Sequence, residues 1–170
     1  MSALSLTLLA VVLAAMWTDV RFRRIPNGLT VTALVAALVL RLILGATALL
    51  DGMLGAGLAL VLVMPLFALG GVGGGDAKLL VAVGAFLGPK GFLVALLATA
   101  IAGGVMSLAW TARRGVILPA LLNTRGLLKY VITAGRRGER TTLAMPGAVS
   151  IPYGVAIAAG AIFALWFAAA

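Results

Sequence analysis

Apolar side chains dominate this chain of 170 residues, of which 64% are hydrophobic and only 10% are charged. Soluble domains are about half apolar and a quarter charged, so the composition excludes an ordinary soluble protein and predicts an all-α, polytopic membrane helix bundle. The chain contains no Cys and no His, which excludes disulfides, thiol nucleophiles, imidazole bases and the usual zinc sites. Most of its 13 Lys and Arg residues flank apolar runs, so the net charge of +9 predicts membrane orientation and not nucleic-acid binding.

Six apolar runs predict about six transmembrane helices in a single membrane-embedded domain spanning residues 1–170. A spanning helix needs about 20 mostly apolar residues. The stretches that separate the apolar runs are rich in Gly, Pro, Asn or charged residues. The runs fall at 2–18, 28–49, 53–70, 77–87, 92–110 and 149–169.

The basic residues predict which side each connection occupies. With six helices, all Lys and Arg residues except Arg41 and Lys90 lie on one side, which the positive-inside rule assigns to the cytoplasm. The N-terminus is then outside, and the first run is an uncleaved helix because its positive charges follow it. If 77–110 were one helix, the most basic loop would move outside, so we predict a turn at 88–91. That loop, 111–147, is expected to be cytoplasmic, with an interfacial helix from Pro119 to Ala134.

The chain has four acidic residues, and this topology separates them. Asp19 and Asp76 fall at cytoplasmic helix ends, whereas Asp51 falls at an outer turn and Glu139 in the basic loop. The run 77–87 is roughly 16 Å long as a helix, against a hydrocarbon core of about 30 Å. Asp76 is therefore expected near or below the headgroups, where a carboxylate is a candidate functional group.

Each of these features also has a purely structural interpretation. Asp76 is suitable as an N-cap after a glycine-rich turn, and Asp19 as a solvated residue beside three arginines. The glycine run 70–75 is suitable for helix packing, and Lys78 for an interface anchor with its ammonium group in the headgroups. The pair at 51–52, Asp followed by Gly, predicts a simple turn.

Two motifs and a third short segment resemble the type IV prepilin peptidase family. Asp19 followed by arginines and by Ile-Pro-Asn at 25–27 resembles the family's first aspartate segment. The stretch from Gly73 through Asp76 to Leu79 resembles its second, the GxGD signature that presenilin-type proteases share more loosely. Pro-Tyr-Gly at 152–154 is similar to a segment before the family's last helix.

The resemblance implies an intramembrane aspartyl endopeptidase of the bacterial inner membrane. Its substrate would be a prepilin, cleaved between its basic leader and its hydrophobic helix at the cytoplasmic face, with lipid as the other partner. Two nearby carboxylates share a proton, so one can activate water while the other polarises the scissile carbonyl without metal or cofactor. The catalytic residues implied are Asp19 and Asp76, and the substrate-binding or site-shaping residues are Pro26, Asn27, Gly73, Gly74, Gly75, Lys78, Pro152, Tyr153 and Gly154.

The chain departs from the larger members of the family in one respect. Those members are known for a cytoplasmic segment with paired cysteines and for N-methylating the new pilin terminus. Because this chain has no Cys, it resembles the short form associated with Flp or tight-adherence pili, and methylation is not expected. The main alternative is a small proton-coupled transporter or channel that uses the same aspartates.

Overall fold

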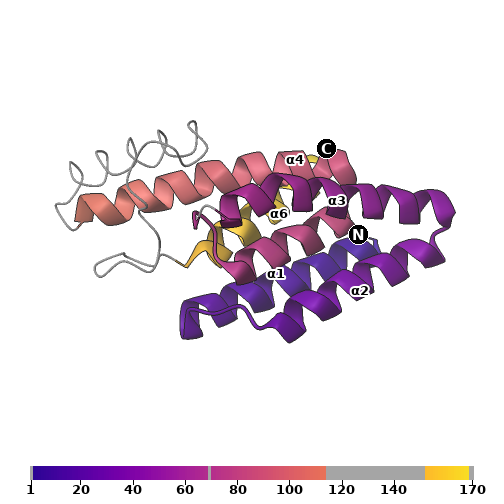
Figure 1. Ribbon diagram of the computed structural model, residues 1–170, viewed down its shortest axis with the longest axis horizontal. Helices are drawn as coiled ribbons and strands as arrows, with labels where there is room; N and C mark the ends of the chain where they lie inside the picture. The colour runs from indigo at the N-terminus through magenta and orange to yellow at the C-terminus, as the bar shows by residue number, and fades with distance from the viewer. Residues whose placement is uncertain (1, 69, 114–151, 169–170) are drawn as a thin grey trace.

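The chain folds as a bundle of helices. The computed structural model describes residues 2–68, 70–113 and 152–168, and within these ranges it contains five helices and no strand. The helices lie roughly side by side along the long axis of the molecule (Figure 1). In chain order they are α1 (Ala3–Phe22), α2 (Asn27–Ile43), α3 (Ala46–Ala68), α4 (Gly74–Arg113) and α6 (Tyr153–Phe167). The all-α prediction is therefore confirmed for this part of the chain.

Helix α4 is interrupted at Gly88. This residue has φ 72° and ψ 178°, which lies outside helical geometry and in a region that side chains disfavour. Pro89 follows at the first position of a new helical segment, where the missing N–H of proline is tolerated best. The turn predicted at 88–91 is thus confirmed, with the break at Gly88 itself.

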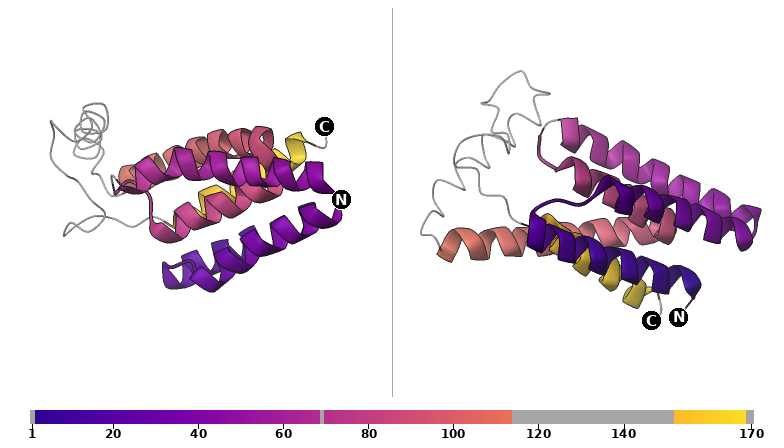
Figure 2. Two further views of the ribbon diagram at one scale, coloured as in Figure 1. Left: turned by 45° about the vertical axis from the view of Figure 1, so that its right-hand side comes forward. Right: turned by 90° about the horizontal axis from the view of Figure 1, so that it is seen from below.

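The two segments of α4 run in opposite directions. In one straight helix Asp76 and Gly103 would lie roughly 40 Å apart at 1.5 Å per residue, yet both line the same cavity. The chain therefore reverses between the segments 74–87 and 89–113, as the two views of Figure 2 show. This reversal returns the second segment to the end of the bundle from which the first began.

The turn between α2 and α3 corrects a prediction. It lies at Leu44 and Gly45, where Gly45 has φ 119° and donates a hydrogen bond of 3.0 Å from its N–H to the carbonyl of Leu42. Asp51 and Gly52, expected to form this turn, lie inside α3. Their turn-like composition reflects a tertiary contact instead, because Asp51 accepts a hydrogen bond from a side chain of α2.

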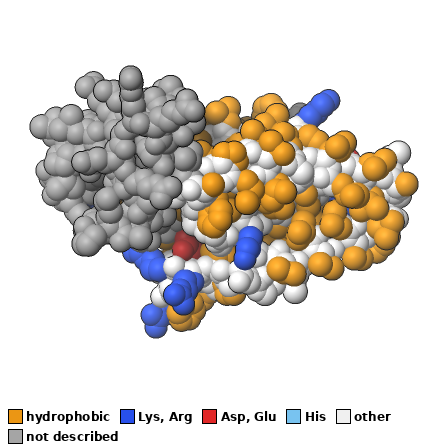
Figure 3. Space-filling view, viewed as in Figure 1, with side chains coloured by type: hydrophobic (Ala, Val, Ile, Leu, Met, Phe, Trp, Pro, Cys, Tyr) orange, Lys and Arg blue, Asp and Glu red, His pale blue; other side chains and the backbone are white. Residues whose placement is uncertain are grey.

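The first segment of α4 forms the centre of the bundle. Side chains on all sides of it are buried, as expected for a helix that is apolar all round. The buried set includes Leu79, Leu80, Ala82, Val83, Ala85 and Phe86. The surrounding helices expose large apolar side chains outward, and hydrophobic side chains are spread over the face seen in Figure 3. This distribution is that of a protein with hydrocarbon as its main solvent.

Two ends of the bundle are distinguished below. The site end holds the residues 19–27 and 71–76, and the far end holds the residues 41–51 and Gly88. By length and composition alone, the described residues include three candidate membrane spans: α1, α3 and the part of α4 from Gly74 to Trp110, although this last part reverses at Gly88. Six spanning helices and an outside N-terminus stay predictions, and the interfacial helix expected at 119–134 lies outside the described residues.

Candidate active site

A cavity of about 780 Å³ lies at the site end, where four helices and two connections meet. The last turn of α1, the connection to α2, the glycine-rich stretch before α4, the second segment of α4 and the first turn of α6 all contribute to it. Asp19 and Asp76 both line it, together with Tyr153. The fold therefore brings into one space two acids from separate helices and the aromatic residue of a third.

Asp19 is held by the backbone of α6. Its side chain is buried, with 8% of the residue exposed, and its Oδ2 accepts a hydrogen bond of 2.8 Å from the N–H of Gly154. That donor belongs to the first turn of α6, where N–H groups lack intrahelical partners and favour a negative charge. A Cβ at position 154 would lie 3.0 Å from Asp19 Cβ and Oδ2, so a glycine permits this contact.

Asp76 lies in the first turn of α4 and faces the same cavity. Its carboxylate accepts a hydrogen bond from the backbone N–H of Gly73, just before the helix, so an acid inside the first turn reaches back to the cap position. Asp76 is therefore not the N-cap residue itself. The negative charge of Asp19 acts on Asp76 across the cavity. The side chain of Asp76 thus both accepts a bond at the start of its helix and faces the cavity that Asp19 lines.

Tyr153 completes the acidic side of the cavity. Its ring lies against Gly103 of the second α4 segment, where a Cβ would come within 2.6 Å of Tyr153 Cε2. The charge of Asp76 also acts on the phenol of Tyr153. Pro152 occupies the N-cap position of α6, so the predicted Pro-Tyr-Gly segment begins the helix that touches Asp19.

The three glycines before Asp76 have three different neighbours. A Cβ at Gly75 would lie 3.1 Å from Ile25 Cβ, and one at Gly74 would lie 3.4 Å from a ring carbon of Phe67. A Cβ at Gly73 would lie 2.8 Å from Asp76 Oδ2. The run therefore allows the chain's own connection between α1 and α2 to approach α4, in agreement with the packing interpretation. All three glycines also line the cavity.

The remaining predicted residues lie at the start of α2. Pro26 is its N-cap residue, and both Pro26 and Asn27 line the cavity. Lys78 is exposed and donates a hydrogen bond of 2.9 Å from Nζ to Asn27 Oδ1. Lys78 is absent from the cavity lining and instead ties α4 to α2 beside it.

Several residues of the cavity were not predicted from the sequence. Arg23 and Arg24 were predicted only to be among the cytoplasmic basic residues, and both line the cavity. Arg23 has φ 54°, a left-handed conformation uncommon outside glycine, and its N–H donates to the Asp19 carbonyl at 2.8 Å. Gly103 and Ser107 also line the cavity, and no local signal marks either of them.

The described residues contain no cluster of three or more His, Cys, Asp or Glu side chains. The expectation of a reaction without metal stays a prediction. What the cavity presents is a pair of carboxylates from two helices, one of them bonded to a helix N-terminus, next to a phenol. Such a pair can hold and transfer a proton between its members and a bound water.

Comparison with known proteins assigns the chain to a family. A model of the type IV leader peptidase family matches residues 6–108, which include both acids of the cavity and the turn at Gly88. No curated protein and no solved structure matches the chain. Membership in a peptidase family, together with the apolar helices, makes this a membrane peptidase and supports that activity over the transporter alternative. The chain belongs to the type IV leader peptidase family.

Proposed function

We propose that the protein is an intramembrane aspartyl endopeptidase that removes the basic leader from type IV prepilins. The observation that carries this proposal is the shared cavity of Asp19 and Asp76, within which the charge of one acts on the other. Two carboxylates whose charges act on each other across one cavity do not both ionise easily, so the pair retains one proton. The charged member removes a proton from water while the protonated member polarises the scissile carbonyl.

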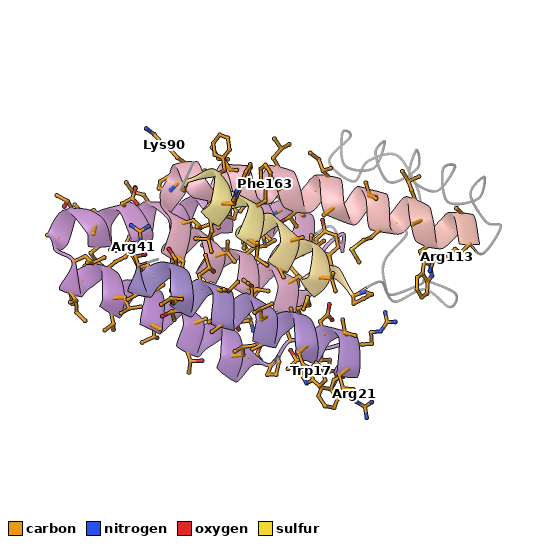
Figure 4. The ribbon with its side chains drawn as sticks, turned by 180° about the vertical axis from the view of Figure 1, so that it is seen from behind. Trp17, Arg21, Arg41, Lys90, Arg113 and Phe163 are labelled. Carbon is orange, nitrogen blue, oxygen red and sulfur yellow. The ribbon has the colours of Figure 1, made fainter. Side chains whose placement is uncertain are left out.

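The charges at the ends of the bundle support an orientation for this site. Arg23 and Arg24 line the cavity, and Arg21 and Arg113 lie at the same end of the molecule (Figure 4). The positive-inside rule places this end at the cytoplasmic face, and the N-terminus at the far end then lies outside. With the two segments of α4 counted separately, the described helices cross the bacterial inner membrane six times.

The first segment of α4 supports a site below the membrane surface. Its residues 74–87 form a helix roughly 20 Å long at 1.5 Å per residue, against a hydrocarbon core of about 30 Å. Asp76, in its first turn, therefore lies at or beneath headgroup depth unless the bilayer thins locally. A peptide bond just cytoplasmic of a substrate's hydrophobic helix would reach the same depth.

The stretch before α4 offers a way to hold an extended substrate. Residues 71–73 line the cavity as non-helical backbone, which membrane proteins tolerate where it borders a cavity. The N–H groups of Gly71 and Gly73 already donate to the Leu66 carbonyl and to Asp76, so an extended peptide would pair with the remaining backbone groups of this stretch. The absence of Cys in the chain supports the short, Flp-type form of the enzyme without methyltransferase activity.

Cleavage of a purified Flp-type prepilin in detergent or liposomes tests the proposal. Asp19→Asn and Asp76→Asn are each expected to lower kcat by about 10²–10⁴-fold, because each removes one proton-transfer group. Glu139→Gln is the matched control, since the sequence places that acid in the basic loop, and it is expected to keep wild-type activity. Undiminished cleavage by either folded Asn variant would refute the dyad, and a wild-type protein without cleavage of any prepilin would refute the substrate.

A further inference from the structure

A buried arginine at the far end of the bundle links three parts of the chain. Arg41, in the last turn of α2, is only 7% exposed. Its Nη1 donates to the carbonyl of Ala48 at 2.9 Å and to Asp51 Oδ2 at 2.7 Å, and its Nη2 donates to the carbonyl of Phe86 at 2.9 Å. A buried cation requires such partners, and the guanidinium holds them in fixed directions because it is planar.

The bond to Phe86 caps the first segment of α4. The chain leaves helical geometry at Gly88, so the last carbonyls of this segment lack intrahelical donors. A cationic side chain at a helix C-terminus satisfies such carbonyls and interacts favourably with the helix dipole. Arg41 therefore fixes the end of the helical segment whose first turn carries Asp76.

Close glycine packing reinforces this attachment. A Cβ at Gly84 would lie 2.9 Å from the carbonyl carbon of Gly55 and 3.0 Å from Ala59 Cβ, so α3 and the first α4 segment meet backbone to backbone. Gly52 leaves the space that the side chain of Arg41 occupies. Helices α2 and α3 thus hold the first α4 segment at the far end through a hydrogen bond and a close backbone contact.

The same helical segment is attached to α2 again at the site end. Lys78 Nζ donates to Asn27 Oδ1, and Gly75 packs against Ile25 just before α2 begins. About 18 Å of uninterrupted helix, here called the rod, separates Asp76 from Gly88 at 1.5 Å per residue. A shift of this rod at Arg41 must therefore appear as a shift of Asp76 relative to Asp19.

We propose that Arg41 is a positioning residue for the active site, acting through the first segment of α4 to set the height of Asp76 beside Asp19. The expected effect on cleavage rests on the proposed function. The expected effect on the position of Asp76 does not. A partly buried ion pair contributes little net stability, which leaves the fixing of one geometry as its main effect. Asp51, whose side chain is 52% exposed, serves as the counter-ion.

Cross-linking at the site end measures the position of the rod directly. The chain has no Cys, so Ile25→Cys with Gly75→Cys introduces a single possible disulfide at a contact where the two Cβ positions lie 3.1 Å apart. With Arg41 intact this pair is expected to oxidise readily, because a separation of 3.1 Å needs only a shift of about 0.4 Å to reach the Cβ spacing of about 3.5–4.5 Å found in disulfides. Failure to cross-link in that background would overturn the proposed attachment.

Substitutions at the far end then test the coupling. Arg41→Lys keeps the charge but loses the directed bonds, and it is expected to slow cross-linking about tenfold. Asp51→Asn keeps both carbonyl bonds of Arg41 and is the milder variant should Arg41→Lys fail to fold, with an expected slowing of about threefold. Lys90→Gln is the control, because Lys90 is exposed and carries a positive charge at the same end of the molecule (Figure 4).

Cleavage kinetics separate positioning from a general loss of structure. In the chain without added cysteines, Arg41→Lys is expected to lower kcat about 10- to 100-fold with KM within about threefold of wild type, since displacement of a reacting group by about 1 Å has that effect. Unchanged cross-linking in both far-end variants, or equal slowing in Lys90→Gln, would overturn the proposal. A wild-type protein that cleaves no prepilin would refute the proposed function, while cross-linking would still decide the coupling.

Discussion

The two ends of the bundle handle buried charge in opposite ways. At the far end, Arg41 and Asp51 carry opposite charges, and the arginine donates three hydrogen bonds. At the site end, Asp19 and Asp76 are both acids, so any charges they carry have the same sign, and they border a cavity of about 780 Å³. Opposite charges joined by directed hydrogen bonds fix a geometry, whereas like charges beside a cavity raise the free energy of the folded chain and leave a proton available for chemistry. The difference supports the proposal that the far end has a structural role and the site end a catalytic one.

The sharpest contrast between the ends comes from removing one acid from each. Asp76→Asn is expected to lower kcat by about 10²–10⁴-fold yet leave the melting temperature equal or higher, because it removes the repulsion from Asp19. Asp51→Asn is expected to lower the melting temperature, because Arg41 then keeps its buried charge without a counter-ion. Thermal unfolding in detergent measures both. A fall of similar size in both variants would show that the two ends do not differ in this respect.

A smaller effect is expected from crowding Asp19. Gly154→Ala places a Cβ 3.0 Å from Asp19 Oδ2, which lengthens or breaks the hydrogen bond from the α6 backbone. We expect kcat to fall about 10- to 100-fold, since a small displacement of a reacting group has that effect. Gly104→Ala is the matched control, because nothing lies within 4 Å of a Cβ there. Equal activity of the two alanine variants would show that the close contact at position 154 is dispensable.

The smallest effect is expected at Lys78. Lys78→Met removes an exposed hydrogen bond to Asn27 and keeps an apolar stem, so stability should change by less than about 0.5 kcal/mol and kcat by less than about threefold. Steady-state cleavage and thermal unfolding check this result. A loss of kcat as large as that of Asp76→Asn would show that Lys78 takes part in catalysis and does not only attach α4 to α2.

Local sequence signals predicted the elements whose ends depend on nearby residues. The breaks after α1, before α4 and at Gly88 follow from glycine, proline and charge at those positions, and the structure has them there. The turn after α2 was placed at Asp51 because Asp followed by Gly usually marks a turn. That prediction was wrong because Asp51 accepts a hydrogen bond from Arg41, ten residues earlier. The turn lies between them, at Gly45.

The two acids of the site could be named from sequence, but their surroundings could not. Carboxylates are rare in apolar chains and the predicted topology placed Asp19 and Asp76 on one side, but it was the resemblance to the peptidase family that implied a catalytic role for both. Gly103 makes room for Tyr153, a residue far along the chain, so only the assembled bundle reveals its purpose. The sequence likewise did not distinguish Arg23 from the other cytoplasmic arginines. In the structure it has a left-handed backbone conformation and lines the cavity.

The main-chain origin of the bond to Asp19 affects how mutations can alter the site. Every residue except proline carries an amide N–H, so almost no replacement at position 154 deletes the donor. What a replacement adds is bulk, which pushes α6 away from α1. This contact therefore depends on the absence of a side chain at position 154. A mutation there would weaken it by adding atoms, and not by removing a functional group.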